Sequence, residues 1–218
     1  MTDTGKATCE LYLITPPSFE VGAFSDQLRQ ALEGGPVACL QLRLKDVSDD
    51  EVRRAAEALL PICHEFEVPL LMNDRPDLAA ETGCDGVHVG QDDAPYKQAR
   101  ELLGRDAMIG VTCKASRDLA VHAAEAGADY VAFGAFFDTT TKKAATKAPI
   151  HLVKWWSDIS IVPSVAIGGI TPENCGPLVI AGVNFLSVIS AVWDHSDGPA
   201  AAIQAFQRAI VDSTAPDW

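Results

Sequence analysis

The strongest constraint on the fold is a regular alternation between short apolar runs and longer segments with helical periodicity. Most of the apolar runs are hydrophobic throughout, which is typical of strands that are covered on both faces of a parallel sheet. The candidate strands span residues 11–15, 38–42, 69–73, 86–89, 108–112, 130–133, 161–167 and 185–189.

Helical periodicity is clearest between the second and third candidate strands. Apolar residues there recur at spacings i, i+3, i+4, i+7, i+8 and i+11, which places them on one face of a helix. They are Val52, Ala55, Ala56, Leu59, Leu60 and Cys63.

Strands that alternate with helices form parallel βαβ units. An open, doubly wound sheet is one solution, but eight regular repeats in 218 residues favour a compact (β/α)₈ TIM barrel. No linker, low-complexity tract or charge block marks a second domain. We therefore expect one domain over residues 1–218, with loose ends near 1–8 and 213–218.

The formal net charge of −13 argues against non-specific binding to nucleic acid or to an anionic membrane. An anionic substrate then needs local cations or a metal ion. No apolar stretch approaches the roughly 20 residues that span a bilayer, and the first residues lack the apolar core of a signal peptide. Six cysteines without a C-x-x-C pair predict buried thiols in a cytoplasmic protein, and no zinc site.

Carboxylates follow two successive candidate strands. Asn73 and Asp74 close the third strand, and Asp92 and Asp93 follow the fourth. In a barrel of this kind, chemistry lies on the loops after the carboxyl ends of the strands. Mg²⁺ held by one or two carboxylates keeps coordination positions for substrate phosphates, so Asp74 and Asp93 predict phosphate chemistry. A solvated acidic turn is the alternative for Asp92 and Asp93.

Three polar side chains follow the second strand on one side of the chain: Gln41, Arg43 and Lys45. Such groups are costly at a barrel mouth unless they meet a ligand or a carboxylate. The alternative to ligand binding is an internal ion pair with Asp74 or Asp93.

The loop after the sixth strand, residues 137–143, is rich in hydroxyl groups and lysine. Thr139, Thr141 and Lys142 are suited to pyrophosphate, although a mobile polar loop has the same composition.

The seventh strand ends in Gly168 and Gly169, and Thr171 with Pro172 predicts the start of a helix. Together with residues 188–190 after the eighth strand, this segment is placed where barrels of this type bind phosphate. His88, inside the fourth strand, is interpreted as a hydrogen-bonded core histidine rather than a base.

These segments together resemble thiamine phosphate synthase, a single-domain (β/α)₈ enzyme, over nearly the whole chain. The stretches that carry the resemblance are Gln41-Leu42-Arg43-Leu44-Lys45, Asn73-Asp74-Arg75-Pro76-Asp77-Leu78-Ala79, Asp85-Gly86-Val87-His88-Val89-Gly90-Gln91-Asp92-Asp93, Thr139-Thr140-Thr141-Lys142 and Val165-Ala166-Ile167-Gly168-Gly169-Ile170-Thr171.

The resemblance implies a transferase that joins hydroxymethylpyrimidine diphosphate to a thiazole phosphate and releases pyrophosphate through a pyrimidine-methyl cation. It implies Mg²⁺ on Asp74 and Asp93. The residues implied to bind the pyrimidine diphosphate are Gln41, Arg43, Lys45, Asn73 and Lys142. Those implied to hold the thiazole phosphate are Thr139, Thr141, Gly169, Val188, Ile189 and Ser190.

Catalytic roles are implied for Lys142, Arg43 and Thr112, with Thr112 placed between the two substrates. Small phosphorylated molecules are the implied partners, and a homodimer is compatible with the family.

The chain departs from the family pattern at Leu44, Lys114, Asp138 and Ile150, where Glu, His, Pro and Gly are usual. One alternative is a thiazole tautomerase-like protein, but Lys114 in place of the histidine that such a protein uses, and the presence of Asp74, Asp93, Arg43 and Lys142, favour the synthase. The departures motivate a second alternative, a non-catalytic paralogue that binds a phosphorylated ligand. A Schiff-base aldolase with Lys142 as nucleophile is a third reading.

Overall fold

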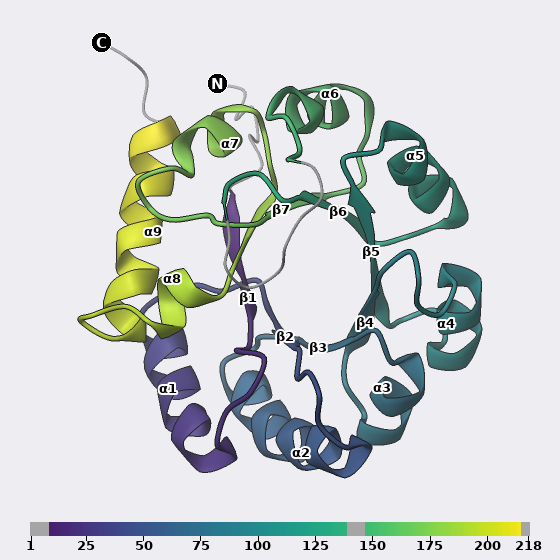
Figure 1. Cartoon of the computed structure of the whole chain (residues 1–218), viewed down its shortest axis with the longest axis vertical. Helices are drawn as coiled ribbons and strands as arrows, with labels where there is room; N and C mark the ends of the chain where they lie inside the picture. Colours follow the sequence, from purple (N-terminus) through teal and green to yellow (C-terminus); the bar gives the residue numbers. More distant parts are fainter. Residues whose placement is uncertain (1–8, 139–146, 215–218) are drawn as a thin grey trace, which may run out of the picture.

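The computed structural model describes residues 9–138 and 147–214, and its eight strands close into a barrel in chain order (Figure 1). Every neighbouring pair is parallel, including the closing pair of first and last strands. The strands are β1 (Glu10–Ile14), β2 (Cys39–Leu42), β3 (Leu70–Asn73), β4 (Gly86–Val89), β5 (Met108–Lys114), β6 (Tyr130–Gly134), β7 (Ser164–Ile167) and β8 (Phe185–Val188). The predicted (β/α)₈ barrel is confirmed.

Helices surround the ring of strands, and α9 lies between α1 and α7 (Figure 1). The helices in the described residues are α1 (Val21–Glu33), α2 (Asp49–Glu65), α3 (Pro76–Thr82), α4 (Tyr96–Leu103), α5 (Arg117–Ala126), α6 (His151–Ile159), α7 (Gly176–Ile180), α8 (Ser190–Trp193) and α9 (Pro199–Thr214). None of the helices within these described ranges combines the length and apolar character needed to span a bilayer.

The hydrophobic core has two parts, because successive residues of each strand point to opposite faces. On β1, Leu11 and Leu13 face the helices, whereas Tyr12 and Ile14 face the barrel interior. Both faces are therefore buried, which explains why the strands are apolar throughout. All six cysteines are free and buried, as predicted.

The predicted helical stripe is confirmed in α2. Ala55, Ala56, Leu59 and Cys63 are buried against the sheet. The helix begins with a capping box, in which Ser48 and Glu51 satisfy each other's backbone N–H groups.

A repeated device fixes the amino-terminal end of the barrel. The residue before β4, β6 and β8 has a side-chain oxygen that accepts a hydrogen bond from the backbone N–H at or near the start of the preceding strand. The pairs are Asp85 with Leu70 at 2.7 Å, Asp129 with Ile109 at 2.7 Å, and Asn184 with Ser164 at 2.9 Å.

The prediction for the seventh strand was too long. β7 begins at Ser164, and Ile161, expected to lie in the strand, is fully exposed. Residues 160–162 instead form a bend: Trp156 Nε1 donates to the Val162 carbonyl at 2.8 Å, and the Val162 N–H donates to Ser160 Oγ at 3.1 Å. These bonds occupy backbone groups that a strand would pair.

The predicted helix start at Thr171 and Pro172 was also wrong. Thr171 opens a separate turn, in which its N–H donates to Asn174 Oδ1 at 2.9 Å, and α7 begins only at Gly176. At the carboxyl end, residues 213 and 214, expected to be loose, form the last turn of α9.

Candidate active site

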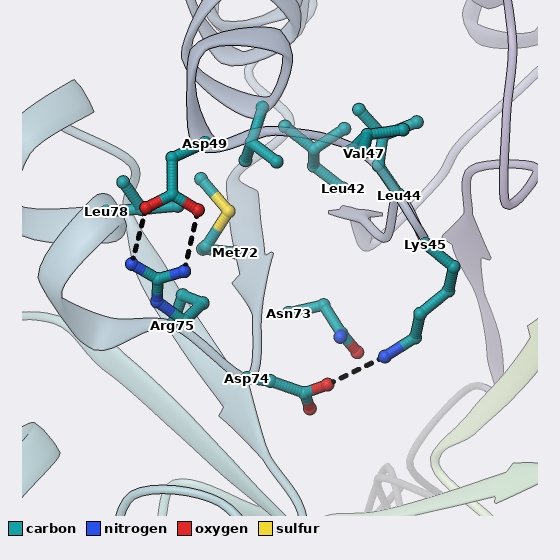
Figure 2. A pocket seen from close by; sticks show the side chains of 11 residues that line it. Leu42, Leu44, Lys45, Val47, Asp49, Met72, Asn73, Asp74, Arg75 and Leu78 are labelled. Atoms are coloured by element: carbon teal, nitrogen blue, oxygen red, sulfur yellow. Dashed lines mark hydrogen bonds and ion pairs between the residues drawn. The ribbon is translucent and has the colours of Figure 1, made fainter.

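Polar side chains from β2, β3 and β4 come together at the carboxyl end of the barrel. Arg43 and Lys45 follow β2, Asn73 and Asp74 lie at the end of β3, and Asp93 lies in the loop after β4. Lys45 Nζ donates to Asp74 Oδ2 at 3.0 Å (Figure 2). The structure thus brings together residues that the sequence analysis assigned to one site.

Asp74 has an unusual backbone conformation, with φ = 64°, in the left-handed region that few non-glycine residues adopt. Its N–H donates to the His88 carbonyl at 2.8 Å, so the residue is tied to β4. Asp93 Oδ2 accepts from the Gly90 N–H at 2.8 Å and closes its own loop. Hydrogen bonds therefore fix the backbone of Asp74 and the carboxylate of Asp93.

The two carboxyl groups interact directly, and their pKa values move in opposite directions. Burial raises the pKa of Asp93, and the hydrogen bond with Asp74 and its charge raise it further. Burial also opposes ionisation of Asp74, but hydrogen bonds with Lys45 and Asp93 outweigh it and leave the pKa below its usual value. Like charges this close disfavour double ionisation, so a cation beside the pair stabilises it.

Arg43 is a half-buried cation without an ion-pair partner in the described part of the chain. Burial lowers the pKa of its guanidinium, and the nearby Asp74 carboxylate opposes this effect. Its backbone N–H donates to Thr15 Oγ1 at 2.9 Å, which holds the end of β2 against the end of β1. The internal ion-pair alternative thus describes Lys45 but not Arg43.

A cavity of about 220 Å³ opens beside this cluster (Figure 2). Its apolar wall includes Leu42, Leu44 and Met72, and its polar rim includes Lys45 and Asp74. Leu44, one of the departures from the family pattern, adds apolar surface here.

Arg75 and Asp49 face each other on the rim of the same cavity (Figure 2). The guanidinium binds the carboxylate at two points, at 2.8 and 3.0 Å. Arg75 directly follows Asp74, so this pair links the first turn of α2 to the loop that carries the carboxylate.

Inside the barrel, below the mouth, five side chains form a continuous hydrogen-bonded chain. Gln41 Nε2 donates to Tyr12 Oη at 2.8 Å, and Tyr12 Oη lies 2.8 Å from Tyr130 Oη. His88 Nδ1 lies 3.0 Å from Tyr130 Oη, and His88 Nε2 lies 2.7 Å from Thr112 Oγ1. The prediction that His88 is a hydrogen-bonded core histidine is confirmed.

Tyr12 and Tyr130 were not predicted as site residues, although the sequence contains a signal for them. Each is the only residue of its strand that is both aromatic and able to form hydrogen bonds, and alternation along the strand places both on the inner face. A buried tyrosine hydroxyl normally has a partner, so two of them predict a polar network inside the barrel.

On the opposite side of the mouth, Gly168 and Gly169 have positive φ angles of 107° and 63°. A Cβ atom on Gly169 would lie 2.2 Å from the Asp138 carbonyl oxygen, and the Phe137 N–H donates to the Gly168 carbonyl at 3.0 Å. The glycines are therefore required for close packing of the loop after β6, whether or not a phosphate also binds there.

The remaining predicted residues divide into two groups. Val188 ends β8, Ile189 follows it, and Ser190 opens the short helix α8. Thr139, Thr141 and Lys142 lie outside the described residues.

The sequence of residues 11–192 matches the family model described as thiamine monophosphate synthase. The chain belongs to this family. The thiamine-phosphate synthase of Rhodospirillum centenum is 55% identical over 93% of this chain and 98% of its own length. That of Hyphomonas neptunium is 48% identical over 99% of this chain and 100% of its own.

A solved structure of thiamine phosphate pyrophosphorylase from Pyrococcus furiosus superposes with a TM-score of 0.82, at 27% identity over 96% of this chain and 99% of that chain. As a member of the thiamine monophosphate synthase family, the protein is an enzyme, a transferase of thiamine biosynthesis. Enzymes of this family act on small phosphorylated substrates.

Proposed function

We propose that the enzyme joins hydroxymethylpyrimidine diphosphate to a thiazole phosphate and releases pyrophosphate by Mg²⁺-assisted dissociative substitution. The observation that carries the proposal is the Asp74–Asp93 carboxylate pair at the mouth of the barrel, with the two cations Arg43 and Lys45 that follow β2 beside it and Lys45 Nζ 3.0 Å from Asp74 Oδ2. Arg43 has no carboxylate partner in residues 9–138 and 147–214. Lys45 does have a carboxylate partner, Asp74, and this carboxylate is also suited to bind a metal ion.

Asp74 and Asp93 fit Mg²⁺ as a pair. No cluster of three or more acidic, histidine or cysteine side chains forms a cage within the described ranges. Two carboxylates are what Mg²⁺ uses when substrate phosphates and water complete its coordination. The pKa of Asp93 is raised and that of Asp74 is lowered, so a second negative charge at the pair is disfavoured, and a bound Mg²⁺ would stabilise that charge. Bound there, Mg²⁺ would supply charge stabilisation for the leaving pyrophosphate.

The protein's own cations would bind the diphosphate. Arg43, half-buried at the mouth, is suited to bind two phosphate oxygens at once, and Lys45 adds a point charge beside Asp74. In this proposal Lys142, from the segment that follows β6 in the sequence, would bind the leaving pyrophosphate. These groups favour departure of pyrophosphate because they stabilise charge that develops as the bond breaks.

The other half of the site would orient the two heterocycles. Gln41 and Asn73 would contact the pyrimidine side, and Thr112 would lie between the two substrates. Thr139, Thr141, Gly169 and the segment 188–190 would hold the thiazole phosphate. A dissociative reaction needs no strong protein base or nucleophile, which agrees with a His88 whose two ring nitrogens are both hydrogen-bonded to side chains inside the barrel.

The experiment is thiamine phosphate formation from the two purified substrates, with and without Mg²⁺, in the native enzyme and in Asp74→Asn. Asp92→Asn is the matched control, because Asp92 lies one residue from Asp93 and its side chain is 95% exposed. We expect metal-dependent turnover that collapses in Asp74→Asn and persists in Asp92→Asn.

Two results would change the proposal. Binding of the thiazole phosphate without turnover at any Mg²⁺ concentration would favour a tautomerase-like or non-catalytic paralogue. Turnover that survives Asp74→Asn would keep the reaction and remove the metal site. Domain extent, a cytoplasmic location and a homodimer stay predictions, the last testable by light scattering.

A further inference from the structure

The hydrogen-bonded chain inside the barrel connects two residues that the proposed function assigns to substrate. Gln41 at one end comes from β2, and Thr112 at the other comes from β5. Between them, Tyr12 of β1, Tyr130 of β6 and His88 of β4 are all buried. None of these three was assigned a role in binding or catalysis above.

The hydrogen bonds of the chain have a direction. The Gln41 amide donates through Nε2 to Tyr12 Oη, and a tyrosine hydroxyl carries a single hydrogen. Tyr12 therefore donates to Tyr130, and Tyr130 donates to His88 Nδ1. His88 then carries its hydrogen on Nε2 and donates it to Thr112 Oγ1.

Burial favours the neutral form of both tyrosines in this hydrogen-bonded chain. It raises the pKa of both Tyr12 and Tyr130 well above the ordinary value for tyrosine. Each hydroxyl thus keeps its hydrogen at neutral pH.

With a single hydrogen on the His88 ring, only one other arrangement pairs every donor with an acceptor along the hydrogen-bonded chain, and it is the complete reversal. Thr112 would then donate to His88 Nε2, and each following group would donate onward until Tyr12 donated to Gln41 Oε1. Any mixed arrangement either leaves a buried hydroxyl hydrogen without an acceptor in the chain or places two hydrogens or two lone pairs against each other, which is costly. The orientation of the Gln41 amide and the direction of the Thr112 hydroxyl are therefore coupled.

We propose that Tyr12, Tyr130 and His88 are positioning residues, which together fix the hydrogen-bonding faces that Gln41 and Thr112 present to the substrate. In the observed direction, Gln41 keeps its carbonyl oxygen as an acceptor and Thr112 keeps its own hydrogen as a donor. The matching ligand presents a donor to Gln41 and an acceptor to Thr112, as a polar nitrogen heterocycle can. The assignment of these ends to substrate rests on the proposed function.

The first test reads the direction of the chain without any substrate. ¹⁵N NMR of labelled histidine distinguishes which ring nitrogen of His88 carries the hydrogen, with the signal assigned by its loss in His88→Asn. We expect the Nε2–H form in the native protein. In Gln41→Glu an ionised carboxylate can only accept, so the chain reverses and the hydrogen moves to Nδ1.

The control for this test is the double variant Gln41→Glu with Tyr12→Phe, which breaks the chain between the new carboxylate and His88. There the hydrogen returns to Nε2. An unchanged Nε2–H form in Gln41→Glu, while the ¹³C shift of Glu shows an ionised carboxylate, would overturn the proposal.

The second test measures kcat/KM. It tests the proposal even if the Gln41→Glu variant does not fold or its new carboxyl group stays protonated. Tyr12→Phe and Thr112→Val each remove one hydroxyl group from the hydrogen-bonded chain, and Tyr130 and His88 lie between the two altered positions. We expect each to lower kcat/KM about tenfold and the double variant to be no worse than the poorer single variant. Losses that multiply would show independent roles and overturn the proposal.

Tyr96→Phe is the matched control, because Tyr96 lies on α4 and its hydroxyl bonds the Gly127 carbonyl outside the barrel. In the double variant Tyr96→Phe with Thr112→Val, the factors by which the two single substitutions change kcat/KM should multiply. If the native enzyme makes no thiamine phosphate, the proposed function is wrong, but the hydrogen-bonded chain can still be tested, because the NMR measurement needs no turnover.

Discussion

The Arg75 guanidinium donates two hydrogen bonds to the Asp49 carboxylate, and it also donates to Asp77 Oδ2 at 2.6 Å. One side chain thus joins the first turn of α2 to the first turn of α3. The residue before Arg75 is Asp74, whose backbone is in the left-handed region. The ion pairs therefore constrain the loop that positions the proposed metal ligand.

Arg75→Lys should separate this positioning role from stability. Lysine keeps the charge but cannot bind a carboxylate at two points. The pairs are about half exposed, so the free energy of unfolding should fall by less than about 1 kcal/mol. The Mg²⁺ concentration for half-maximal turnover should rise several-fold, as measured by metal titration beside urea unfolding. Equal metal dependence in both proteins would show that the loop holds its shape alone.

Arg43→Gln tests the unpaired cation at the mouth. A charge-assisted hydrogen bond to a phosphate contributes about 1.5–3 kcal/mol, so kcat/KM for the pyrimidine diphosphate should fall about 10- to 100-fold. Arg105→Gln, an exposed substitution in the connection between α4 and β5, should leave it unchanged. Similar small effects of both substitutions would remove Arg43 from the site.

The repeating pattern of the sequence predicted the barrel because both faces of each strand are buried, and strand limits agree within two residues except at β7. At β7, Ile161 is apolar and β-branched, yet its neighbours bond Trp156 and Ser160. Hydrogen bonds between residues only six and two positions apart thus overrode the strand propensity of this segment. The carboxylate pair at Asp74 and Asp93 was predictable, because carboxyl ends of parallel strands meet at one end of a barrel.

Other properties of the site depend on contacts that periodicity does not encode. The hydrogen-bonded chain needs Tyr12 and Tyr130 to meet across the barrel, although 118 positions separate them in sequence. Gly169 was explained by phosphate approach, whereas its close neighbour in the structure is the Asp138 carbonyl. Thr139, Thr141 and Lys142 stay predictions, because they lie outside the described residues.

Gly169→Ala tests the packing of the loop after β6, and Gly83→Ala is its matched control. Both glycines have similar positive φ angles, 63° and 73°, so alanine meets the same backbone strain at each. Only at Gly169 does the new Cβ collide with another backbone, at 2.2 Å from the Asp138 oxygen; at Gly83 nothing lies within 4 Å.

We expect Gly83→Ala to lower the free energy of unfolding by about 1 kcal/mol and leave kcat/KM unchanged. Gly169→Ala should cost about 1–3 kcal/mol more and reduce turnover, because the displaced segment leads into the proposed substrate loop. Urea unfolding and steady-state kinetics measure both quantities. If both substitutions lower the free energy of unfolding by the same amount, the loop after β6 moves aside for the methyl group without loss of stability, which would contradict the prediction.

Glu20 predicts a pH dependence of stability away from the site. Its carboxylate accepts from the Ala23 and Gly22 N–H groups at 2.7 and 2.9 Å, and these bonds lower its pKa below 4.5 in the folded protein. A lowered folded-state pKa adds stability that is fully present above the unfolded-state pKa and is lost as pH falls through the folded-state pKa.

Glu20→Gln should therefore be less stable than the native protein at pH 7, and this difference should shrink as the pH falls below about 4.5. Glutamine retains an oxygen acceptor for α1 but not the negative charge that favours a helix amino terminus. Urea unfolding at several pH values measures the difference. Asp26→Asn, a change of the same kind on the same helix, is the comparison. A Glu20→Gln difference that stays constant from pH 7 to pH 3 would contradict the assignment, because a charge effect must vanish when the carboxylate is protonated.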